Sequence, residues 1–385
     1  MVYWRWISGW HPGAPGVLQA VGSLGPMLVL AGAFVAGCAV TPSGPPLSTS
    51  EMVHYPAAPD EPRIVFLATL DEMATGRQSR DWLRRYLYGP SKGGGSSAVK
   101  PFGIQVWHDE VLICDTQQNC VHSVSLTDGQ RSRLGEGANS PSKPLDVDVD
   151  AMGNRYVADA GRGQVLVYDA NNLFVRNLID DPTESFKPVS VAVGDDTVYV
   201  ADAGGWNVHA YAIADGAHRW TIGGRGQEPG EFLMPSGVAV DRDRQVYVVD
   251  SLLCRVQVFD STGTFVRQFG QPGQTAGSMA RPRRIAVGPD GVIYVADALF
   301  NRVHMFDQQG RILMLFGGPG DAPGATNLAA DICIDTGPLE RYAAWIPTDF
   351  DPSYVLLVTS QLGAGRVNIY AFGQMRAGNP SAISP

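Results

Sequence analysis

Charge is scarce in this sequence, and most of it is negative. Only 17 % of the side chains are charged, and 38 acids against 29 bases give a net charge of −9. Such a surface repels a phosphate backbone at long range, so nucleic-acid binding is not expected. Cysteine occurs five times, and no Cys-x-x-Cys-His run provides an attachment site for c-type haem. A glycine-rich phosphate loop and a Ser/His/Asp pattern are also missing.

Turn residues are plentiful, with 45 glycines and 27 prolines, and they punctuate a repeat. Its clearest copies are PSGVAVDRDRQVYVVDSLLCRVQVFD (Pro235 to Asp260) and PRRIAVGPDGVIYVADALFNRVHMFD (Pro282 to Asp307). Earlier copies begin at Pro101, Pro144 and Pro188, which gives steps of 43, 44, 47 and 47 residues. A period of this length, filled with short β-branched runs, predicts the blades of a β-propeller.

Each repeat predicts three strands and a weaker fourth, as at residues 237–240, 246–249, 255–259 and 265–270. An aspartate recurs just after strand two, where a short carboxylate can accept hydrogen bonds from the turn's own amides. We interpret these residues as structural: Asp115, Asp159, Asp202, Asp250 and Asp297.

A sixth, damaged copy begins at Ala329 and is interrupted by an insertion from Thr336 to Ser353. It lacks an outer strand after Phe372, whereas the apolar strand Arg63 to Leu70 has no blade of its own. Pairing the two covers two exposed edges, so we predict that this strand closes the ring. A helix is predicted over residues 78–88, before blade one, and residues 374–385 are a C-terminal tail.

The N-terminus differs in composition from the rest of the chain. An apolar run from Val17 to Gly37 ends in small residues before Cys38, which is typical of a secretory signal over residues 1–37. The VAGC ending resembles a bacterial lipobox. That resemblance implies lipidation of Cys38 and, because Ala39 follows, sorting to the outer membrane. A plain anchor helix is the alternative. Residues 38–62 hold six prolines and predict an extended tether.

Residues 223–270 (GGRGQEPGEFLMPSGVAVDRDRQVYVVDSLLCRVQVFDSTGTFVRQFG) resemble the NHL repeat closely. Repeats three and five are strong, one and two are degenerate, and six is fragmentary. The resemblance implies an all-β fold, a six-bladed propeller of NHL type over residues 63–373. The chain is similar to exported bacterial six-bladed NHL lipoproteins, periplasmic or surface-exposed, a family that supplies a scaffold and rarely an assigned activity. Some relatives occur with multihaem cytochrome systems, which implies an envelope partner by association only.

Some propellers of this kind are lyases that hold a metal with histidines directly after the strand-one prolines. No histidine occurs at those positions here: Phe102, Leu145, Val189, Ser236, Arg283 and Ala330. His122, His209 and His304 instead share one strand-three position, where Gln257 stands in blade four. Strand three lies about 9–10 Å outside the innermost strand. These histidines are therefore too far apart to share an ion, and we predict that they pack between blades.

Oxygen-bearing side chains from three adjacent innermost strands face the predicted channel: Gln105, Asp146, Asp148 and Asp331. They would suit a hard cation such as Ca²⁺. Arg283 and Arg284 lie in the same region and could neutralise the acids. We favour a hydrated polar channel without a cofactor. A metal-dependent lyase or hydrolase acting in the channel is the alternative function.

The four cysteines after Cys38 leave two interpretations open. Cys114 and Cys120 flank one predicted hairpin turn and are the most plausible disulfide pair in an exported protein. Cys114 and Cys333 stand where sister repeats have alanine, so small buried thiols are an equal contender, together with Cys254.

Large apolar residues occupy turns between strands two and three in blades three to six: Trp206, Leu252, Leu253, Leu299, Phe300 and Leu362. Contiguous apolar surface often marks a binding site, although these side chains could also fold against neighbouring loops. The leading hypothesis is a lipid-anchored, non-catalytic scaffold that presents a protein- or ligand-binding face in the cell envelope. A small-molecule carrier remains a further hypothesis.

Overall fold

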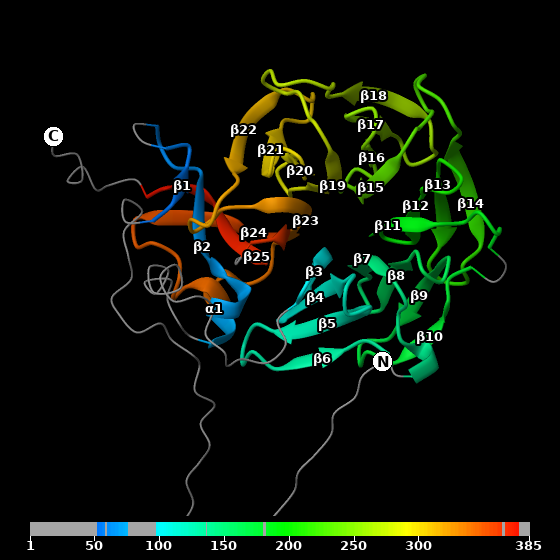
Figure 1. Cartoon of the computed structure of the whole chain (residues 1–385), viewed down its shortest axis with the longest axis horizontal. Coiled ribbons are helices and arrows are strands. Elements are labelled where there is room, and N and C mark those ends of the chain that lie inside the picture. Colours follow the sequence, from blue (N-terminus) through cyan, green and yellow to red (C-terminus); the bar gives the residue numbers. More distant parts are fainter. Residues whose placement is uncertain are drawn as a thin grey trace, which may run out of the picture. The chain divides into compact units, whose positions relative to one another are not determined.

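Six antiparallel sheets make up the part of the chain that the computed structural model describes, residues 52–57, 60–75, 98–135, 137–179, 182–363 and 366–376. All of these residues belong to one compact unit, Ala39–Pro385. The sheets surround a central channel (Figure 1). The innermost strands contact one another in the closed cycle β3, β7, β11, β15, β19, β23 and back to β3. The predicted all-β, six-bladed propeller is confirmed.

Blades one to five each pair their strands in chain order, from the channel outward. Blade one comprises β3 (Pro101–Trp107), β4 (Glu110–Asp115), β5 (Cys120–Ser125) and β6 (Arg131–Arg133). Blade two comprises β7 (Pro144–Val149), β8 (Arg155–Asp159), β9 (Gln164–Tyr168) and β10 (Phe174–Asn177). Blade three comprises β11 (Pro188–Val193), β12 (Thr197–Asp202), β13 (Asn207–Ala212) and β14 (His218–Gly223). Blades four and five comprise β15 (Pro235–Val240), β16 (Val246–Asp250), β17 (Arg255–Phe259), β18 (Phe265–Phe269); and β19 (Pro282–Val287), β20 (Ile293–Asp297), β21 (Arg302–Phe306), β22 (Ile312–Gly317). Blade six comprises β23 (Asn327–Asp335), β24 (Phe350–Leu362), β25 (Val367–Met375), β2 (Ile64–Thr69) and β1 (His54–Tyr55).

The burial patterns of the strands follow their place in the blade. In blade four, β16 and β17 are buried throughout, because both faces of a middle strand pack against neighbouring blades. The outer strand β18 alternates between exposed and partly buried residues, as expected where one face meets water. Its predicted bounds, 265–270, agree with the observed strand to within one residue.

Blade six is completed from the other end of the described chain, as predicted. Strand β2 pairs antiparallel with β25, with Ile64 opposite Phe372 and Thr69 opposite Asn368, and Figure 1 shows the two strands side by side. β1 then pairs with β2, so a strand occurs within the segment expected to be a tether. Strand β25 likewise extends to Met375, into the expected tail. Leu70 begins the short helix α1 (Leu70–Thr75) instead of ending the strand.

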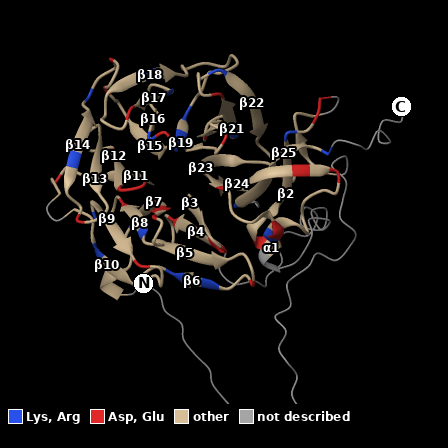
Figure 2. Cartoon of the chain, turned by 180° about the vertical axis from the view of Figure 1, so that it is seen from behind, with Lys and Arg blue, Asp and Glu red and all other residues tan. Residues whose placement is uncertain are grey.

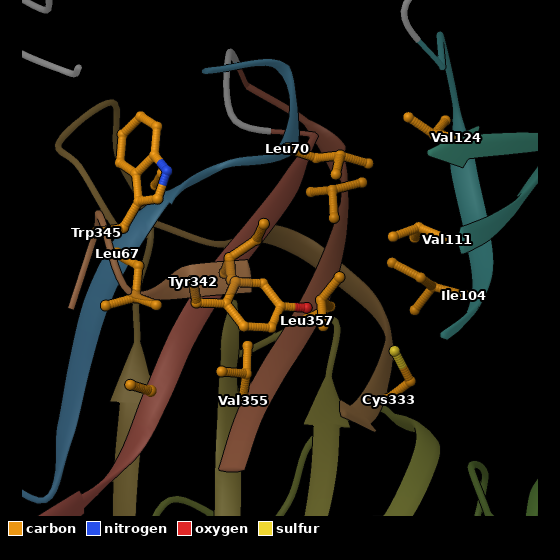
Figure 3. Packing of buried hydrophobic residues seen from close by; sticks show 14 of the residues in the cluster. Leu67, Leu70, Ile104, Val111, Val124, Cys333, Tyr342, Trp345, Val355 and Leu357 are labelled. Atoms are coloured by element: carbon orange, nitrogen blue, oxygen red, sulfur yellow. The ribbon is translucent and has the colours of Figure 1, made fainter. Parts of the chain in front are cut away.

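The core is divided into six apolar clusters, one between each pair of adjacent blades. The largest lies between blades six and one, where Leu67 of β2 and Val355 and Leu357 of β24 face Ile104 and Val111 of blade one (Figure 3).

The insertion of blade six covers this same cluster. Its side chains Tyr342, Trp345 and Phe350 are buried in it, and the Tyr342 hydroxyl donates to Asp335 Oδ2 at 2.7 Å. Within the insertion, 3₁₀ turn η4 (Leu339–Tyr342) carries Arg341, which contacts Asp109 of blade one at 3.2 Å. The insertion is therefore a local cap that ties blade six to blade one.

The signal segment 1–37, the lipidation site Cys38 and the predicted helix 78–88 lie outside the described residues. Within the described part of the chain, no helix has the length and apolar character needed to span a bilayer. A second 3₁₀ turn, η3 (Gly137–Asn139), lies between blades one and two.

Candidate functional site

The channel is lined by the six innermost strands and encloses about 260 Å³. Five of these strands shift register directly after their first residue, for example between Pro144 and Asp146, and β23 does so between Ala329 and Asp331. Such a bulge changes the direction of the following side chains. The residue two positions after the last residue before this shift therefore lies against another blade. We call this set the girdle: Gly103, Asp146, Ser190, Gly237, Arg284 and Asp331.

The girdle residues satisfy the free edge of the neighbouring innermost strand. Asp146 Oδ2 accepts hydrogen bonds from Ser190 Oγ at 2.6 Å and from the Val191 amide at 3.0 Å. Ser190 Oγ in turn lies 3.1 Å from the Val238 amide, which donates to it. Where the girdle residue is Gly103, a Cβ atom would lie 2.6 Å from the Cα of Asp146, so only glycine fits that approach.

Arg284 crosses the channel at the end where the innermost strands begin. Its guanidinium donates to the backbone carbonyls of Ser236, Val189 and Leu145, which belong to blades four, three and two. Its Nε lies 3.5 Å from Asp146 Oδ2. The ring of Phe102 from blade one lies 5.1 Å from the guanidinium carbon. One arginine thus joins five blades and fills this end of the channel.

Two further acids line the channel. Asp148 accepts hydrogen bonds from the Gln105 amide, from the Val149 amide at 2.8 Å and from the Val193 amide at 2.7 Å. Burial raises its pKa to about 6. Asp331 accepts from the Ile104 amide at 2.9 Å and the Ile332 amide at 2.7 Å. Burial, together with nearby Asp146, raises the pKa of Asp331 well above its usual value.

These contacts bear on the proposed cation set Gln105, Asp146, Asp148 and Asp331. Each carboxylate oxygen of the three aspartates already accepts an N–H group, and Arg284 supplies a positive charge beside Asp146. Among the described residues, no group of three or more His, Cys, Asp or Glu side chains is arranged to hold a metal ion. The donor set therefore fits a hydrogen-bonded girdle better than an open cation site.

The strand-three histidines each face the aspartate of their own blade's turn. The shortest N–O distances are 3.8 Å for His122 and Asp115, 3.6 Å for His209 and Asp202, and 3.7 Å for His304 and Asp297. In blade four, Gln257 is buried and donates to the Glu231 carbonyl at 2.8 Å. The position thus serves packing and local hydrogen bonding, with each histidine in its own blade.

The strand two–three turns are fixed by their aspartates. Asp250 Oδ1, for example, accepts amide hydrogen bonds from Leu252 and Leu253, both at 3.1 Å. Because Pro235 pairs with Asp250, these turns emerge at the end where the innermost strands begin. We call this end the turn face; it carries residues 116–119, 160–163, 203–206, 251–254, 298–301 and 361–363.

Three of the proposed face residues are well exposed: Leu252 at 62 %, Leu299 at 63 % and Leu362 at 53 %. Leu253 and Phe300 are only half-buried. Trp206 does not stand at their matching position. It lies four residues after its turn aspartate, where Cys254 and Asn301 stand in the next blades, and all three adopt a positive φ. Trp206 stacks with Arg225 at 5.3 Å and is half-buried.

The four cysteines of the described residues are free and buried. Cys114 and Cys120 therefore do not form a disulfide bond. The structure agrees with the other interpretation, in which the cysteines are small buried thiols. Cys114 faces blade two and Cys333 faces blade one, each within an inter-blade cluster.

A family model for the NHL repeat matches residues 232–259, which span strands β15, β16 and β17 of blade four. The chain is a six-bladed propeller that contains an NHL repeat. Among curated proteins, none matches this NHL-repeat propeller.

Solved structures share the fold at low identity. A gluconolactonase from Xanthomonas campestris is 14 % identical with a TM-score of 0.54, covering 88 % of this chain and 98 % of that one. A streptogramin B lyase is 15 % identical with a TM-score of 0.52, covering 74 % and 86 %. A structural genomics protein from Bacteroides thetaiotaomicron is 16 % identical with a TM-score of 0.54, covering 72 % and 70 %. At this identity, the likeness concerns the fold and not the chemistry.

Sequence reasoning missed the role of Ser190 and only partly anticipated that of Arg284. Both stand at the second position after the strand-one start, and a comparison of that column across the repeats would have grouped them with Asp146 and Asp331. The reach of Arg284 to three carbonyls could not be read from the sequence, because it depends on the channel's width.

Proposed function

We propose that this propeller is a non-catalytic scaffold that binds a protein partner through the turn face, held at the cell envelope by a lipid on Cys38. The observation that carries the proposal is the exposure of Leu252, Leu299 and Leu362 on three successive blades. Apolar side chains held on rigid turns of adjacent blades offer a partner preordered contact area.

The channel argues against the alternative of a metal-dependent lyase or hydrolase. Its carboxylate oxygens accept N–H groups, and the Arg284 side chain fills the end where the strand-one starts converge. A catalytic carboxylate would need free lone pairs and room for substrate next to them. The polar groups here are instead used to join blades.

The test is site-specific photo-crosslinking in cells that produce the protein. A crosslinking residue at position 252 or 299 is expected to give one adduct of defined mass, and Leu362→Asp in the same chain should remove it. Position 313 is the matched control, because Leu313 is 53 % exposed but lies on the outer strand β22. Equal adducts from positions 299 and 313, or an adduct that survives Leu362→Asp, would contradict the turn face as the binding surface.

A further inference from the structure

The residue that precedes each innermost strand is held in the same way in five blades. In blade two, the Lys143 amide donates to Asp159 Oδ1 at 2.8 Å, and the Lys143 carbonyl accepts from the Ala160 amide at 3.1 Å. The same two-sided contact with the turn aspartate and the residue after it holds the residues Lys100, Lys187, Met234 and Arg281. The backbone at this position is therefore fixed at the mouth of the channel.

Four of these five residues are cations, and all four are exposed. They are Lys100, Lys143 and Lys187 in blades one to three and Arg281 in blade five. Across the described ranges, no ion pair involves any of them. Their charges are therefore available to a partner. This local excess of positive charge contrasts with the net charge of −9 for the whole chain.

Arg283 adds to the same positive mouth. Its side chain is half-buried, donates to Gln361 Oε1 at 3.0 Å and lies over Phe102 at 5.4 Å. Burial and the neighbouring guanidinium groups of Arg281 and Arg284 lower its pKa to about 10. A nearby anion would relieve this repulsion.

Among the described residues, the acids of the turn face form no ion pair with these four exposed cations. The turn aspartates are buried and accept backbone amides. Glu184 and Glu228 stand earlier in the loops that run inward from the outer strands, before Lys187 and Met234. Figure 2 places red segments at the centre of the ring, and these include β7, whose Asp146 and Asp148 are bonded within the channel.

The turn face therefore has two unlike halves. Blades one to three present Lys100, Lys143 and Lys187 beside turns whose one large apolar side chain is the half-buried Trp206. Blades four to six present the three exposed leucines, with Arg281 in blade five. We propose that the basic half docks an acidic segment of the protein partner, whose adjoining apolar side chains cover the leucines. This proposal rests on the proposed function and specifies its partner's chemistry. Charge complementarity next to an apolar contact is typical of protein interfaces.

A fluorescein-labelled octaglutamate peptide tests whether the basic half binds an acidic segment. Its anisotropy is titrated with the purified protein at low and at moderate salt. The triple variant Lys100→Glu, Lys143→Glu, Lys187→Glu is expected to bind at least tenfold more weakly. Wild-type binding is expected to weaken as salt rises, because exposed charges are screened.

The matched control reverses Arg242, Arg244 and Arg311, which lie in turns at the opposite end of the propeller. It changes the net charge equally and should leave peptide binding within about twofold. An equal loss in both triple variants would overturn the proposal, because the effect would then come from net charge. Tighter binding of a DNA duplex or of phosphatidylglycerol vesicles through the same lysines would overturn the protein assignment.

The two proposals fail in distinguishable ways. If the affinity for the octaglutamate peptide does not change with the lysine reversals while the crosslink from position 299 persists, the proposal of an acidic partner segment is wrong and the proposed scaffold function is retained. If the crosslink fails while the peptide still depends on the lysines, the apolar face of the proposed function is wrong.

Discussion

Single side chains at one repeated position differ widely in electrostatics. His122 and His304 both stand in strand three and both lie under 4 Å from their turn aspartate. The nearby Asp115 carboxylate, followed by the Cys120 side chain, raises the pKa of His122 to about 9. Burial lowers the pKa of His304 to about 4. Neither His304 ring nitrogen has a hydrogen-bond partner among the described residues. Neighbouring groups therefore decide the charge that a shared position carries.

The two histidines should give stability opposite dependences on pH. The folded pKa of His122 lies above the usual 6.5, so its contribution is full below pH 6.5 and is lost as pH rises through about 9. The folded pKa of His304 lies below 6.5, so stability falls as pH drops from 6.5 toward 4.

Substitution by glutamine, the residue of blade four at this position, tests both signs. His122→Gln should lower the unfolding free energy at pH 6 by about 1–3 kcal/mol, with little difference above pH 10. His304→Gln should raise it at pH 5 and leave it unchanged at pH 8. Urea unfolding followed by tryptophan fluorescence measures both, with the exposed His218→Gln as control. Parallel pH profiles for the two variants would contradict this assignment.

Asp148 gives a second pH-dependent prediction. Its folded pKa of about 6 lies above the usual 3.8, so its contribution is full below pH 3.8 and is lost as pH rises through 6. The melting temperature of Asp148→Asn relative to wild type should therefore be several degrees higher at pH 7.5 than at pH 4. This change with pH adds to a pH-independent loss, because asparagine offers only one acceptor oxygen to the amides of Val149 and Val193. The exposed Asp243→Asn is the control. A difference from wild type that does not change between pH 4 and 7.5 would show that burial of the charge is not the cause.

At the level of secondary structure, the innermost strand does more than line the channel. Its channel-side edge presents amides that would otherwise be unpaired, and side chains of the preceding blade accept their hydrogen bonds: the girdle residues Asp146, Ser190 and Asp331, and Asp148. Buried backbone groups left without partners are costly, so these side chains join blades that share no sheet hydrogen bonds. Arg284 does the same for three carbonyls.

Removing Arg284 should therefore weaken the whole ring. Arg284→Met leaves three carbonyls without their donor and Asp146 without its cation. The unfolding free energy should fall by about 3–5 kcal/mol in denaturant titrations. Arg242→Met, on an exposed turn, should change it by less than about 0.5 kcal/mol. If Asp146→Ala in the Arg284→Met background costs as much as it does alone, the two residues are not coupled.

At the level of the whole molecule, stability depends on closing a ring whose core is divided among six interfaces. Blade six obtains its outer strands from residues 54–69, and its insertion packs into the interface with blade one. Without β2, the edge of β25 would be exposed to other chains. The interface between blades six and one would also lose Val65, Leu67 and Ala68.

A truncation pair tests closure. A chain that begins at residue 98 lacks β1, β2 and α1 and should lose cooperative unfolding or aggregate. A chain that begins at residue 52 keeps every described residue and should melt as the full chain does. Circular dichroism melting and size-exclusion chromatography measure both. Equal melting temperatures for the two truncated chains would show that β2 is not needed to close the ring.

Much of this architecture was readable from the repeat. Strand positions in blades four and five, the structural turn aspartates and the pairing of residues 63–70 with blade six all followed from spacing and from an unpaired strand. These features are local or periodic, so sequence order is enough to predict them. Trp206 was misplaced by one turn position, because composition alone does not reveal which residue adopts a positive φ.

The sequence by itself determined the number of blades, the positions of the strands in the clearest repeats and the absence of histidine from the lyase positions. Only the tertiary structure decided what the channel side chains do. The acids of β7 and β23 lie next to backbone amides of other blades, and Arg284 reaches carbonyls 48, 95 and 139 residues away in sequence. It also revealed that Lys100, Lys143 and Lys187 share one mouth of the channel. Such contacts depend on ring closure, because closure sets distances between residues that no local pattern connects.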